Sequence, residues 1–422
     1  MAVFSNLPAS AENSSIRPFT CSVGEQELDD SKSLIRLSKV AVPTFENTHT
    51  GEEHRYQYGI DREFILKAKD IWMREYDWRA TEARINSYPN FMAEVIDDDR
   101  TVFQVHFLAL FSTNKNAIPL LMLHGWPGIV PYTLNRFIGN VMEFFATLDL
   151  LKEKFTPESL PYHIVVPSLP GYAFSSLPED KDFKVADSAR IIHKLMLLLG
   201  LRGYVAQGGD IGSGVARYCL SLYDECKAAH VNLLMGTPPP QSEGLEVTEE
   251  EQKGLARIEE FMTLGSGYAI SHATVPSTTG LTLAASPLGL LAWVGEKLVR
   301  WADEKPPIKT ILDFVSLYFL TGTIERSIHV YREVFIPGKS IPGFPPSPAG
   351  KTFGFSDFAK ESTPPPKSWA EYWAGGKDRL QFYRYHESGG HFAALEKPVV
   401  FLKDVMDFVA MVQERDRQNV TV

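Results

Sequence analysis

The sequence predicts an α/β protein with a doubly wound, mostly parallel sheet, a helical lid and an N-terminal region that wraps the core. Two continuous apolar runs, 118–123 and 162–169, are typical of strands that helices cover on both faces. A helical pattern at 185–199 separates the second run from another strand-like run beginning at Tyr204, and strand, helix, strand with short connections is the doubly wound arrangement. Strand patterns stop from about 237 to 350 and return at 352–358 and 381–385, so we expect the residues between to form the lid.

The other elements follow from local periodicity. Residues 1 to about 50 show little of it, and we expect them to lie over the surface. Apolar side chains then recur at three and four residues from Phe64 to Tyr76, which predicts a helix capped by Asp61. Further predicted elements are a helix at 79–85, strands at 101–111 and 230–235, and a C-terminal helix at 399–413. We therefore divide the chain into an N-terminal region (1–100), a first part of the core (101–236), a lid (237–350) and a second part of the core (351–422).

Length and composition exclude several classes of function. A chain of 422 residues exceeds the usual single core, so one large domain with insertions or two closely packed pieces is expected. The net charge of -10 and the lack of a Lys/Arg cluster argue against a nucleic-acid partner, because phosphate binding needs a basic surface. The three cysteines, Cys21, Cys219 and Cys226, are too few for a disulfide framework and match no metal spacing. We expect a cytoplasmic protein without a metal ion or cofactor.

No membrane association is expected either. The first 15 residues lack the basic start and apolar centre of a secretory signal. The long apolar tract from Leu281 to Trp301 contains Pro287 and Gly289 at its middle, and charged residues interrupt its last turns. We interpret this tract as a buried part of the lid.

The segment from Gly203 to Gly214 supplies the first candidate for chemistry. A strand-like run meets a cluster of glycines around Asp210, and a helical pattern follows directly. Gly208 and Gly212 flank Asp210 at minus and plus two, the spacing of a nucleophile elbow, in which only glycine-sized neighbours fit. The alternative is an ordinary turn in which Asp210 caps the next helix.

An aspartate elbow needs a base and an acid that orients it, and both follow the nucleophile in chain order. His391 comes after the last predicted strand and behind the glycine pair Gly389-Gly390, which makes it the candidate base. The acid is expected after the preceding strand, where Asp357 and Glu361 both qualify. Spacing alone does not choose between them.

Three motifs together carry a resemblance: 124–128 (His-Gly-Trp-Pro-Gly), 208–213 (Gly-Gly-Asp-Ile-Gly-Ser) and 389–394 (Gly-Gly-His-Phe-Ala-Ala). In this order they resemble the epoxide hydrolases of the α/β-hydrolase superfamily, and more narrowly the microsomal-type branch that includes fungal soluble members. Segments at 76–86 and 286–297 are similar to the N-terminal domain and the lid of that branch. The resemblance implies the α/β-hydrolase fold, a small-molecule epoxide as substrate and a homodimer.

The resemblance also implies roles for individual residues. Asp210 would be the nucleophile and His391 the base, and the match of 358–361 to the family's Phe-Pro-Lys-acid stretch favours Glu361 over Asp357. Tyr268 and Tyr331 match the two lid tyrosines that activate the epoxide oxygen. The expected product is a vicinal diol, formed through an ester on the aspartate.

The chemistry of the expected ester also predicts which groups surround it. The backbone N–H groups of Trp126 and Ile211 are expected to form the oxyanion hole. We expect the side chains of Trp126, Phe174 and Phe392 to line the pocket, which would favour apolar or aryl epoxides. The Trp126-Pro127 bond is expected to be cis, and His124 is interpreted as a hydrogen-bonded support of its loop rather than a catalytic group.

Three other functions compete with this one. Haloalkane dehalogenases share the aspartyl ester but place a tryptophan directly after the nucleophile, where this chain has Ile211. A biosynthetic cyclase would open the epoxide with a hydroxyl of the substrate and release a cyclic ether. A non-catalytic binding module would not need all of these roles to be filled.

Overall fold

The described residues form a nine-stranded sheet that is mostly parallel. The computed structural model describes residues 4–49, 57–127, 141–240, 247–336 and 343–420, so Gly128 of the first motif lies outside the described residues. Strands β4 to β9 pair in parallel in the order β5-β4-β6-β7-β8-β9, and β1, β2 and β3 extend the β5 edge in antiparallel pairs. The strands are β1 Ile16–Pro18, β2 Asn90–Ile96, β3 Val102–Leu110, β4 Ile118–Leu123, β5 Tyr162–Pro167, β6 Tyr204–Gly208, β7 Cys226–Val231, β8 Thr352–Lys360 and β9 Leu380–Gly390.

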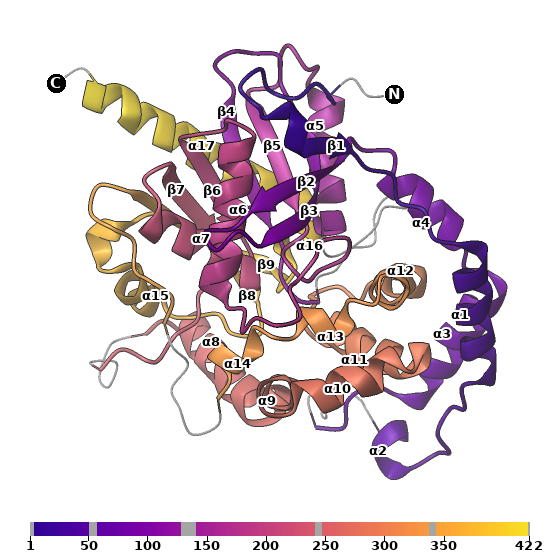
Figure 1. Cartoon of the computed structure of the whole chain (residues 1–422). Coiled ribbons are helices and arrows are strands. Elements are labelled where there is room, and N and C mark those ends of the chain that lie inside the picture. Colours follow the sequence, from indigo (N-terminus) through magenta and orange to yellow (C-terminus); the bar gives the residue numbers. More distant parts are fainter. Residues whose placement is uncertain (1–3, 50–56, 128–140, 241–246, 337–342, 421–422) are drawn as a thin grey trace.

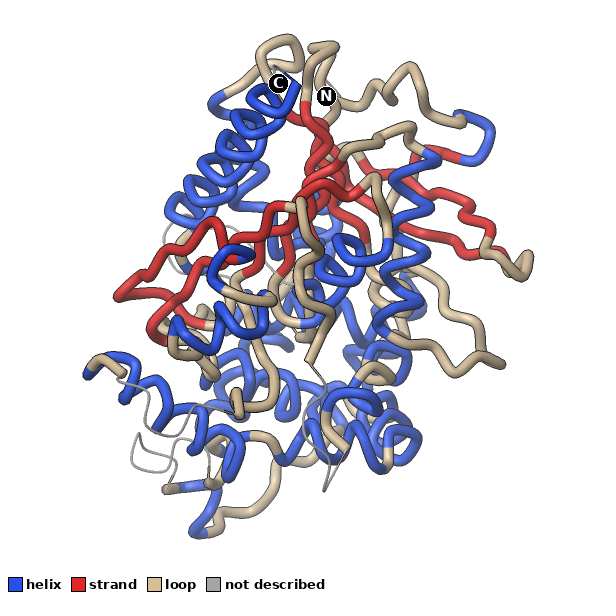
Figure 2. Tube along the Cα trace, turned by 90° about the vertical axis from the view of Figure 1, so that its left-hand side faces the viewer, coloured by secondary structure: helices blue, strands red, loops and turns tan. Residues whose placement is uncertain are grey.

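Helices cover the two faces of this sheet, as expected for strands that are buried on both sides (Figures 1 and 2). α6 and α7 pack against each other on one side of the sheet, and α5, α16 and α17 pack together on the other. The arrangement confirms the predicted α/β fold. The core helices are α5 Phe145–Lys154, α6 Val185–Leu198, α7 Ile211–Leu222, α15 Lys367–Ala374, α16 Ala393–Glu396 and α17 Pro398–Val420.

The lid lies below the carboxyl ends of the parallel strands in Figure 1. Its described residues form helices without strands, as the sequence predicted for 237–350. α8 passes through one turn of π-helix, Phe261–Gly265, into α9. The lid helices are α8 Glu249–Glu260, α9 Gly267–Thr274, α10 Pro276–Ala284, α11 Pro287–Arg300, α12 Ile308–Leu320, α13 Ile324–Ser327 and α14 Tyr331–Val334.

The N-terminal helices run from the sheet to the lid and contact it. α1 and α3 pack on α11 and α12, and α4 packs on α12 (Figure 1). The predicted cap of α3 is present, because Asp61 accepts a hydrogen bond from the backbone N–H of Phe64 at 2.5 Å. The helices of this region are α1 Glu25–Leu37, α2 Phe45–Thr48, α3 Arg62–Arg74 and α4 Trp78–Ile85.

Two sequence-based expectations about elements were wrong. The strand predicted at 230–235 is β7, which starts at Cys226 and ends at Val231. It ends there because Val231 pairs with Gly208, the last residue of the parallel neighbour β6. The apolar residues after it, Leu233 and Met235, line a cavity instead. The N-terminal region also contributes α1 and the strands β1 and β2, where we expected little regular structure or none.

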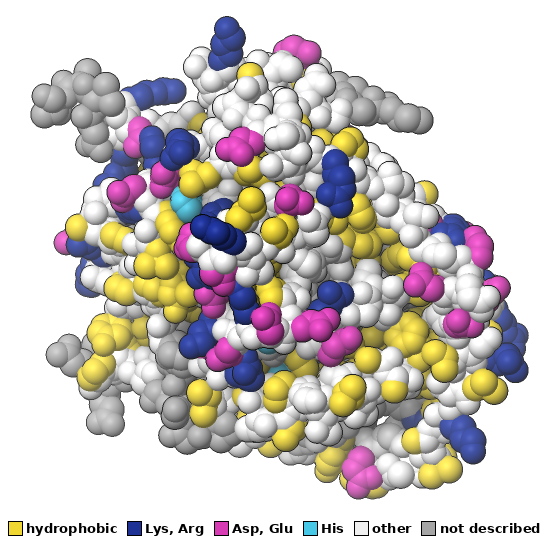
Figure 3. Space-filling view, viewed as in Figure 1, with side chains coloured by type: hydrophobic (Ala, Val, Ile, Leu, Met, Phe, Trp, Pro, Cys, Tyr) yellow, Lys and Arg dark blue, Asp and Glu magenta, His cyan; other side chains and the backbone are white. Residues whose placement is uncertain are grey.

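The apolar tract of 281–301 is divided between two lid helices. Within the described residues no single helix has both the length and the apolar composition of a membrane span. α10 and α11 meet that description only when taken together, and a bend of 117° separates them. On the face shown in Figure 3, basic and acidic side chains are interspersed rather than gathered by sign.

Candidate active site

Asp210 lies at a sharp turn between β6 and α7, at the carboxyl end of the sheet. Its φ of 48° falls in the left-handed region, which is unfavourable for a residue with a Cβ atom and is typical of strained functional turns. A Cβ atom on Gly208 would lie 2.1 Å from the carbonyl oxygen of Gly212, and one on Gly212 would lie 2.3 Å from that of Leu123. Both glycines are therefore required sterically, and the turn has the tight geometry that their spacing predicted.

The carboxylate of Asp210 has a different environment at each oxygen. Oδ1 accepts hydrogen bonds from the backbone N–H groups of Ile211 at 2.5 Å and Trp126 at 3.0 Å. Oδ2 lies 2.9 Å from Nε2 of His391. The loop that carries Trp126 approaches closely because Gly125 has no side chain; a Cβ atom there would lie 2.2 Å from Cβ of Asp210. One oxygen is thus held by backbone donors, and the other faces the imidazole.

His391 follows directly after β9 and joins Asp210 to a second carboxylate. Its Nδ1 donates to Glu361, at 2.8 Å from Oε1 and 3.0 Å from Oε2. Oε1 also accepts from the backbone N–H of Ser362 at 2.6 Å and from its hydroxyl at 2.7 Å. Glu361 is therefore fixed, and it fixes the imidazole with a proton on Nδ1.

Asp357, the other acid that spacing allowed, lies elsewhere. Its Oδ2 accepts a hydrogen bond from the hydroxyl of Tyr383 at 3.0 Å, and burial raises its pKa to about 7. Glu361 is the carboxylate that contacts His391.

The two carboxylates control the charge of His391. Burial by itself favours the neutral imidazole, but the contacts with Glu361 and Asp210 outweigh it and hold the pKa of His391 well above its ordinary value. The two carboxylates thus favour the imidazolium form of the ring.

Tyr268 and Tyr331 come from α9 and α14 and face the same cavity as Asp210. Their ring centroids are 5.6 Å apart with planes at 77°, and Trp126 stacks on Tyr268 at 5.5 Å. Burial, together with the charge of Asp210, raises the pKa of both phenols well above 10. Both side chains therefore keep their protons at neutral pH and can act as hydrogen-bond donors.

A small cavity of about 60 Å³ joins these groups. The carboxylate of Asp210, the imidazole of His391 and the two phenols belong to a wall that is otherwise mainly apolar. The other lining residues are Ile211, Ser213, Leu233, Met235, Phe261, Trp301, Val330, Val334, Phe335, Phe344, Ser362 and Thr363.

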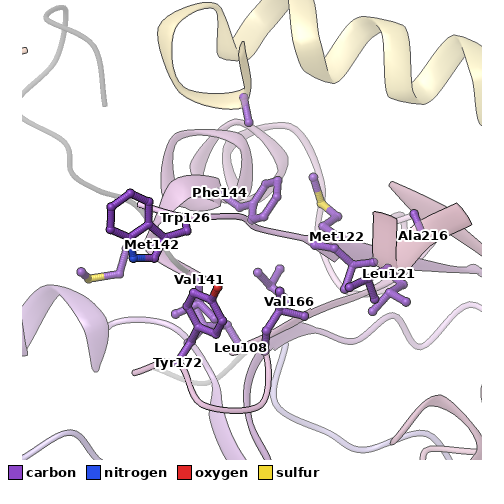
Figure 4. Close-up of a cluster of buried hydrophobic side chains, with 14 of the residues drawn as sticks. Leu108, Leu121, Met122, Trp126, Val141, Met142, Phe144, Val166, Tyr172 and Ala216 are labelled. Atoms are coloured by element: carbon purple, nitrogen blue, oxygen red, sulfur yellow. The ribbon is translucent and has the colours of Figure 1, made fainter. Parts of the chain in front are cut away.

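The three aromatic residues that we expected to line the pocket are placed differently. Trp126 is fully buried, in a cluster of apolar side chains that Figure 4 shows; its ring packs on Tyr268, and its backbone N–H donates to Asp210. Phe174 packs on Phe19 and His106, and Phe392 packs on Trp301 and His391. None of the three is among the described residues that line the cavity. The expectation for their side chains was wrong because spacing along the chain does not fix which way a ring points.

His124 has the hydrogen bonds of a support. Its Nδ1 donates to the carbonyl oxygen of Gly125 at 3.1 Å, and its Nε2 accepts from the backbone N–H of Leu169 at 3.1 Å. Burial lowers its pKa to about 4, so the ring is neutral. The Trp126-Pro127 bond is cis, as expected.

Sequence reasoning missed two groups beside the site. Trp301 lines the cavity, and its carbonyl oxygen accepts from the backbone N–H of His391 at 3.2 Å. Glu143 is buried, and burial raises its pKa to about 8, with Asp210 adding to the effect and His391 opposing it. A single acid within the apolar run 141–145 was the available signal for Glu143.

The described residues contain no group of three or more His, Cys, Asp or Glu side chains arranged to hold a metal ion. The three cysteines are buried and free, and burial raises the pKa of each thiol.

Comparison with known proteins identifies the family. Residues 16–131 match the family described as epoxide hydrolase N terminus, and residues 118–278 match the alpha/beta hydrolase fold. A putative epoxide hydrolase from Dothistroma septosporum is 38% identical over 412 residues, which cover 97% of this chain and 93% of the relative. The chain belongs to the epoxide hydrolase family.

Other epoxide hydrolases support this membership. The structure of Aspergillus niger epoxide hydrolase superposes with a TM-score of 0.84 at 44% identity, covering 97% of this chain and 99% of the other. Epoxide hydrolase 1 of Sus scrofa is 29% identical, over 97% of this chain and 91% of the relative. The resemblance inferred from the three motifs is confirmed, together with the α/β-hydrolase fold.

Proposed function

We propose that the protein hydrolyses apolar or aryl epoxides to vicinal diols through an ester on Asp210. One observation carries the proposal: a single cavity contains the carboxylate of Asp210, an imidazole 2.9 Å from one of its oxygens, and two protonated phenols. Membership of the epoxide hydrolase family gives the same reaction class.

In the first step Oδ2 of Asp210 attacks one epoxide carbon in line with the breaking C–O bond. A carboxylate is ionised at neutral pH, so no base has to deprotonate it before attack. The epoxide oxygen becomes negative as the bond breaks, and the phenols of Tyr268 and Tyr331 offset that charge. One phenol transfers its proton to this oxygen, which leaves a hydroxyalkyl ester on Asp210.

In the second step water, deprotonated by His391, attacks the carbonyl carbon of the ester. Ester formation removes the negative charge of Asp210, one of the two charges that keep the imidazole protonated. His391 can then pass its proton to the phenolate left by the first step and act as a base, while Glu361 holds the ring and stabilises the imidazolium that forms again. The proton that ester hydrolysis releases replaces the one that His391 gave to the phenolate.

The oxyanion of the second step forms on Oδ1. This oxygen already accepts from the N–H groups of Trp126 and Ile211, so the donors are in position before the charge develops. Ile211 is also the first residue of α7, and the positive end of the helix dipole favours negative charge here.

The substrate class follows from the space around the site. A second pocket of about 270 Å³ adjoins the catalytic cavity, and Met235 and Thr363 line both. Its wall is mainly apolar and includes Trp369 and Trp373. We assign the second pocket to the apolar or aryl substituent, because a cavity of about 60 Å³ holds little more than the epoxide ring.

Isotope labelling tests this mechanism. In a single turnover in H₂¹⁸O, with enzyme in excess over styrene oxide, the first diol should contain no ¹⁸O, and the label should enter Asp210. Direct attack of water on the epoxide would put ¹⁸O into the diol and contradict the proposal. In a series of epoxides with increasingly long apolar or aryl substituents, kcat/KM should rise until the substituent fills the second pocket.

The competing functions give other products. A cyclase would release a cyclic ether from an epoxide that carries a hydroxyl, a dehalogenase would release halide from a chlorinated alkane, and a binding module would turn over neither. Ile211 lines the cavity where dehalogenases have tryptophan, and its side chain offers no N–H to a halide. The homodimer that the resemblance implies can be checked by the molar mass in solution.

A further inference from the structure

A buried ammonium group lies behind one of the two phenols. Lys297, on α11, is 3% exposed, and its Nζ is 4.9 Å from the ring centroid of Tyr268 and 4.8 Å from that of Trp293. Lysine is rarely buried, because an ammonium loses its hydration there and needs compensating contacts. Two aromatic faces and the carboxylate of Glu296 supply them.

Burial lowers the pKa of Lys297, whereas the carboxylate of Glu296 raises it and favours the ammonium. Glu296 pairs with it, but the Glu296 side chain is 22% exposed and therefore partly hydrated, whereas the Lys297 side chain is 4% exposed. His272 packs edge-on against Tyr268, and its pKa is lowered to about 3, mainly by burial and further by Lys297. Its neutral ring accepts from Nε1 of Trp293 at 3.0 Å. Among the described residues, Lys297 is the cation that lies over the Tyr268 ring.

In the proposed first step Tyr268 has to lose its proton, and a nearby cation makes that loss more favourable. The phenol has to give up its proton in a buried site next to the carboxylate of Asp210, and both conditions disfavour a phenolate. A positive charge behind the ring favours the phenolate by Coulomb attraction and does not occupy the cavity.

We propose that the ammonium of Lys297 stabilises the negative charge that Tyr268 acquires as its proton moves to the epoxide oxygen. Lys297 is thus a positioning residue that acts through Tyr268, and this role rests on the proposed function. As the Asp210–carbon bond forms and the carbon–oxygen bond breaks, the epoxide oxygen takes the phenol proton and the charge passes to the Tyr268 oxygen. His391 later returns a proton to that oxygen.

The two half-reactions separate this role from a structural one. Lys297→Met keeps the length of the side chain and removes its charge, and ester formation should slow by about tenfold, the effect of a charge at this range in a partly screened site. Ester hydrolysis does not use the acidity of the phenol and should keep its rate. Both rates can be followed in single turnovers of styrene oxide by rapid quenching and mass measurement of the protein. Equal slowing of both steps would overturn the proposal.

A second variant tests whether the charge of Lys297 is needed. Glu296→Gln removes the carboxylate that raises the pKa of Lys297, so burial favours the neutral amine and ester formation should slow as in Lys297→Met. Ester hydrolysis should keep its rate in this variant too. Ester formation that is unchanged, or slowed together with hydrolysis, would contradict the proposal, and this measurement stands even if Lys297→Met does not fold.

The effect should also depend on one phenol and not on the other. In a Tyr268→Phe background Lys297→Met should change ester formation little further, whereas in a Tyr331→Phe background the tenfold loss should remain. Loss in both backgrounds would show that Lys297 does not act through Tyr268. If the natural protein formed no ester at all, the proposed function would fail first, and that result is distinct from any of these.

Discussion

Nε2 of His391 lies 2.9 Å from Oδ2 of Asp210, so the proposed base of the second step is in contact with the proposed nucleophile of the first. The contact couples the charge of one residue to that of the other. While Asp210 is a carboxylate, it helps to keep His391 protonated; once Asp210 is an ester, that contribution is lost. In the proposed mechanism this hydrogen bond therefore links the charge on His391 to the order of the two chemical steps.

The coupling predicts a lower pKa for His391 in Asp210→Asn, because the amide is as neutral as the ester. NMR titration of labelled histidine measures this pKa in both proteins. In the natural protein the pKa of His391 is raised on folding, so its contribution to stability is present below the ordinary histidine pKa and is lost as the pH rises through the folded value. This pH-dependent part of the unfolding free energy should shrink in Asp210→Asn. An unchanged His391 pKa would contradict the coupling.

His391→Gln should trap the ester. The variant retains Asp210 and both phenols, so ring opening continues while water is no longer activated. Protein mixed with styrene oxide should gain the mass of one epoxide, located on the peptide that contains Asp210. Asp210→Asn in the same mixture is the control and should gain nothing at this site. Full turnover by His391→Gln would exclude His391 as the base.

Glu361→Gln should slow ester hydrolysis by roughly four orders of magnitude, the loss found when the acid that orients a catalytic histidine becomes an amide. Ester formation should be affected much less, since it does not use the base. Asp357→Asn is the matched control, because Asp357 is also buried near the end of β8 but contacts Tyr383 instead of His391. Comparable slowing by the control would show that the local fold, and not the contact with His391, matters.

The elements that steric rules dictate could be predicted from the sequence. The turn around Asp210 leaves no space for a Cβ atom at Gly208 or Gly212. A restriction of this kind can be recognised in the sequence, because it fixes both the residue type and the spacing. The choice between Asp357 and Glu361 was not visible from spacing. Strand β8 continues to Lys360, with an irregularity in its pairing with β9 between Phe358 and Lys360, and this places Glu361 at the strand end. The family resemblance supplied that choice.

Other features depend on three-dimensional packing. The apolar run 233–235 looks like a strand, yet Leu233 and Met235 line the cavity after β7 has ended. Phe174 packs on Phe19 and Phe392 packs on Trp301, and residue spacing does not show in which direction either ring points. Lys297 stood in a motif that resembled the lid of the family, but its place behind Tyr268 became visible only with α9 and α11 packed together.

The approach of the Trp126 loop to Asp210 can be tested through Gly125. In Gly125→Ala the new Cβ atom would lie 2.2 Å from Cβ of Asp210, so the loop has to move and the N–H of Trp126 is withdrawn from Oδ1. Loss of one oxyanion donor lowers kcat by about 10²- to 10³-fold, and we expect ester hydrolysis to fall by that factor. Gly267→Ala is the matched control, since nothing lies within 4 Å of its added Cβ atom and it begins the helix that carries Tyr268. Thermal unfolding of both variants shows whether the chain remains folded at the assay temperature. A folded Gly125→Ala variant with the natural hydrolysis rate would mean that the N–H of Trp126 is not part of the oxyanion hole.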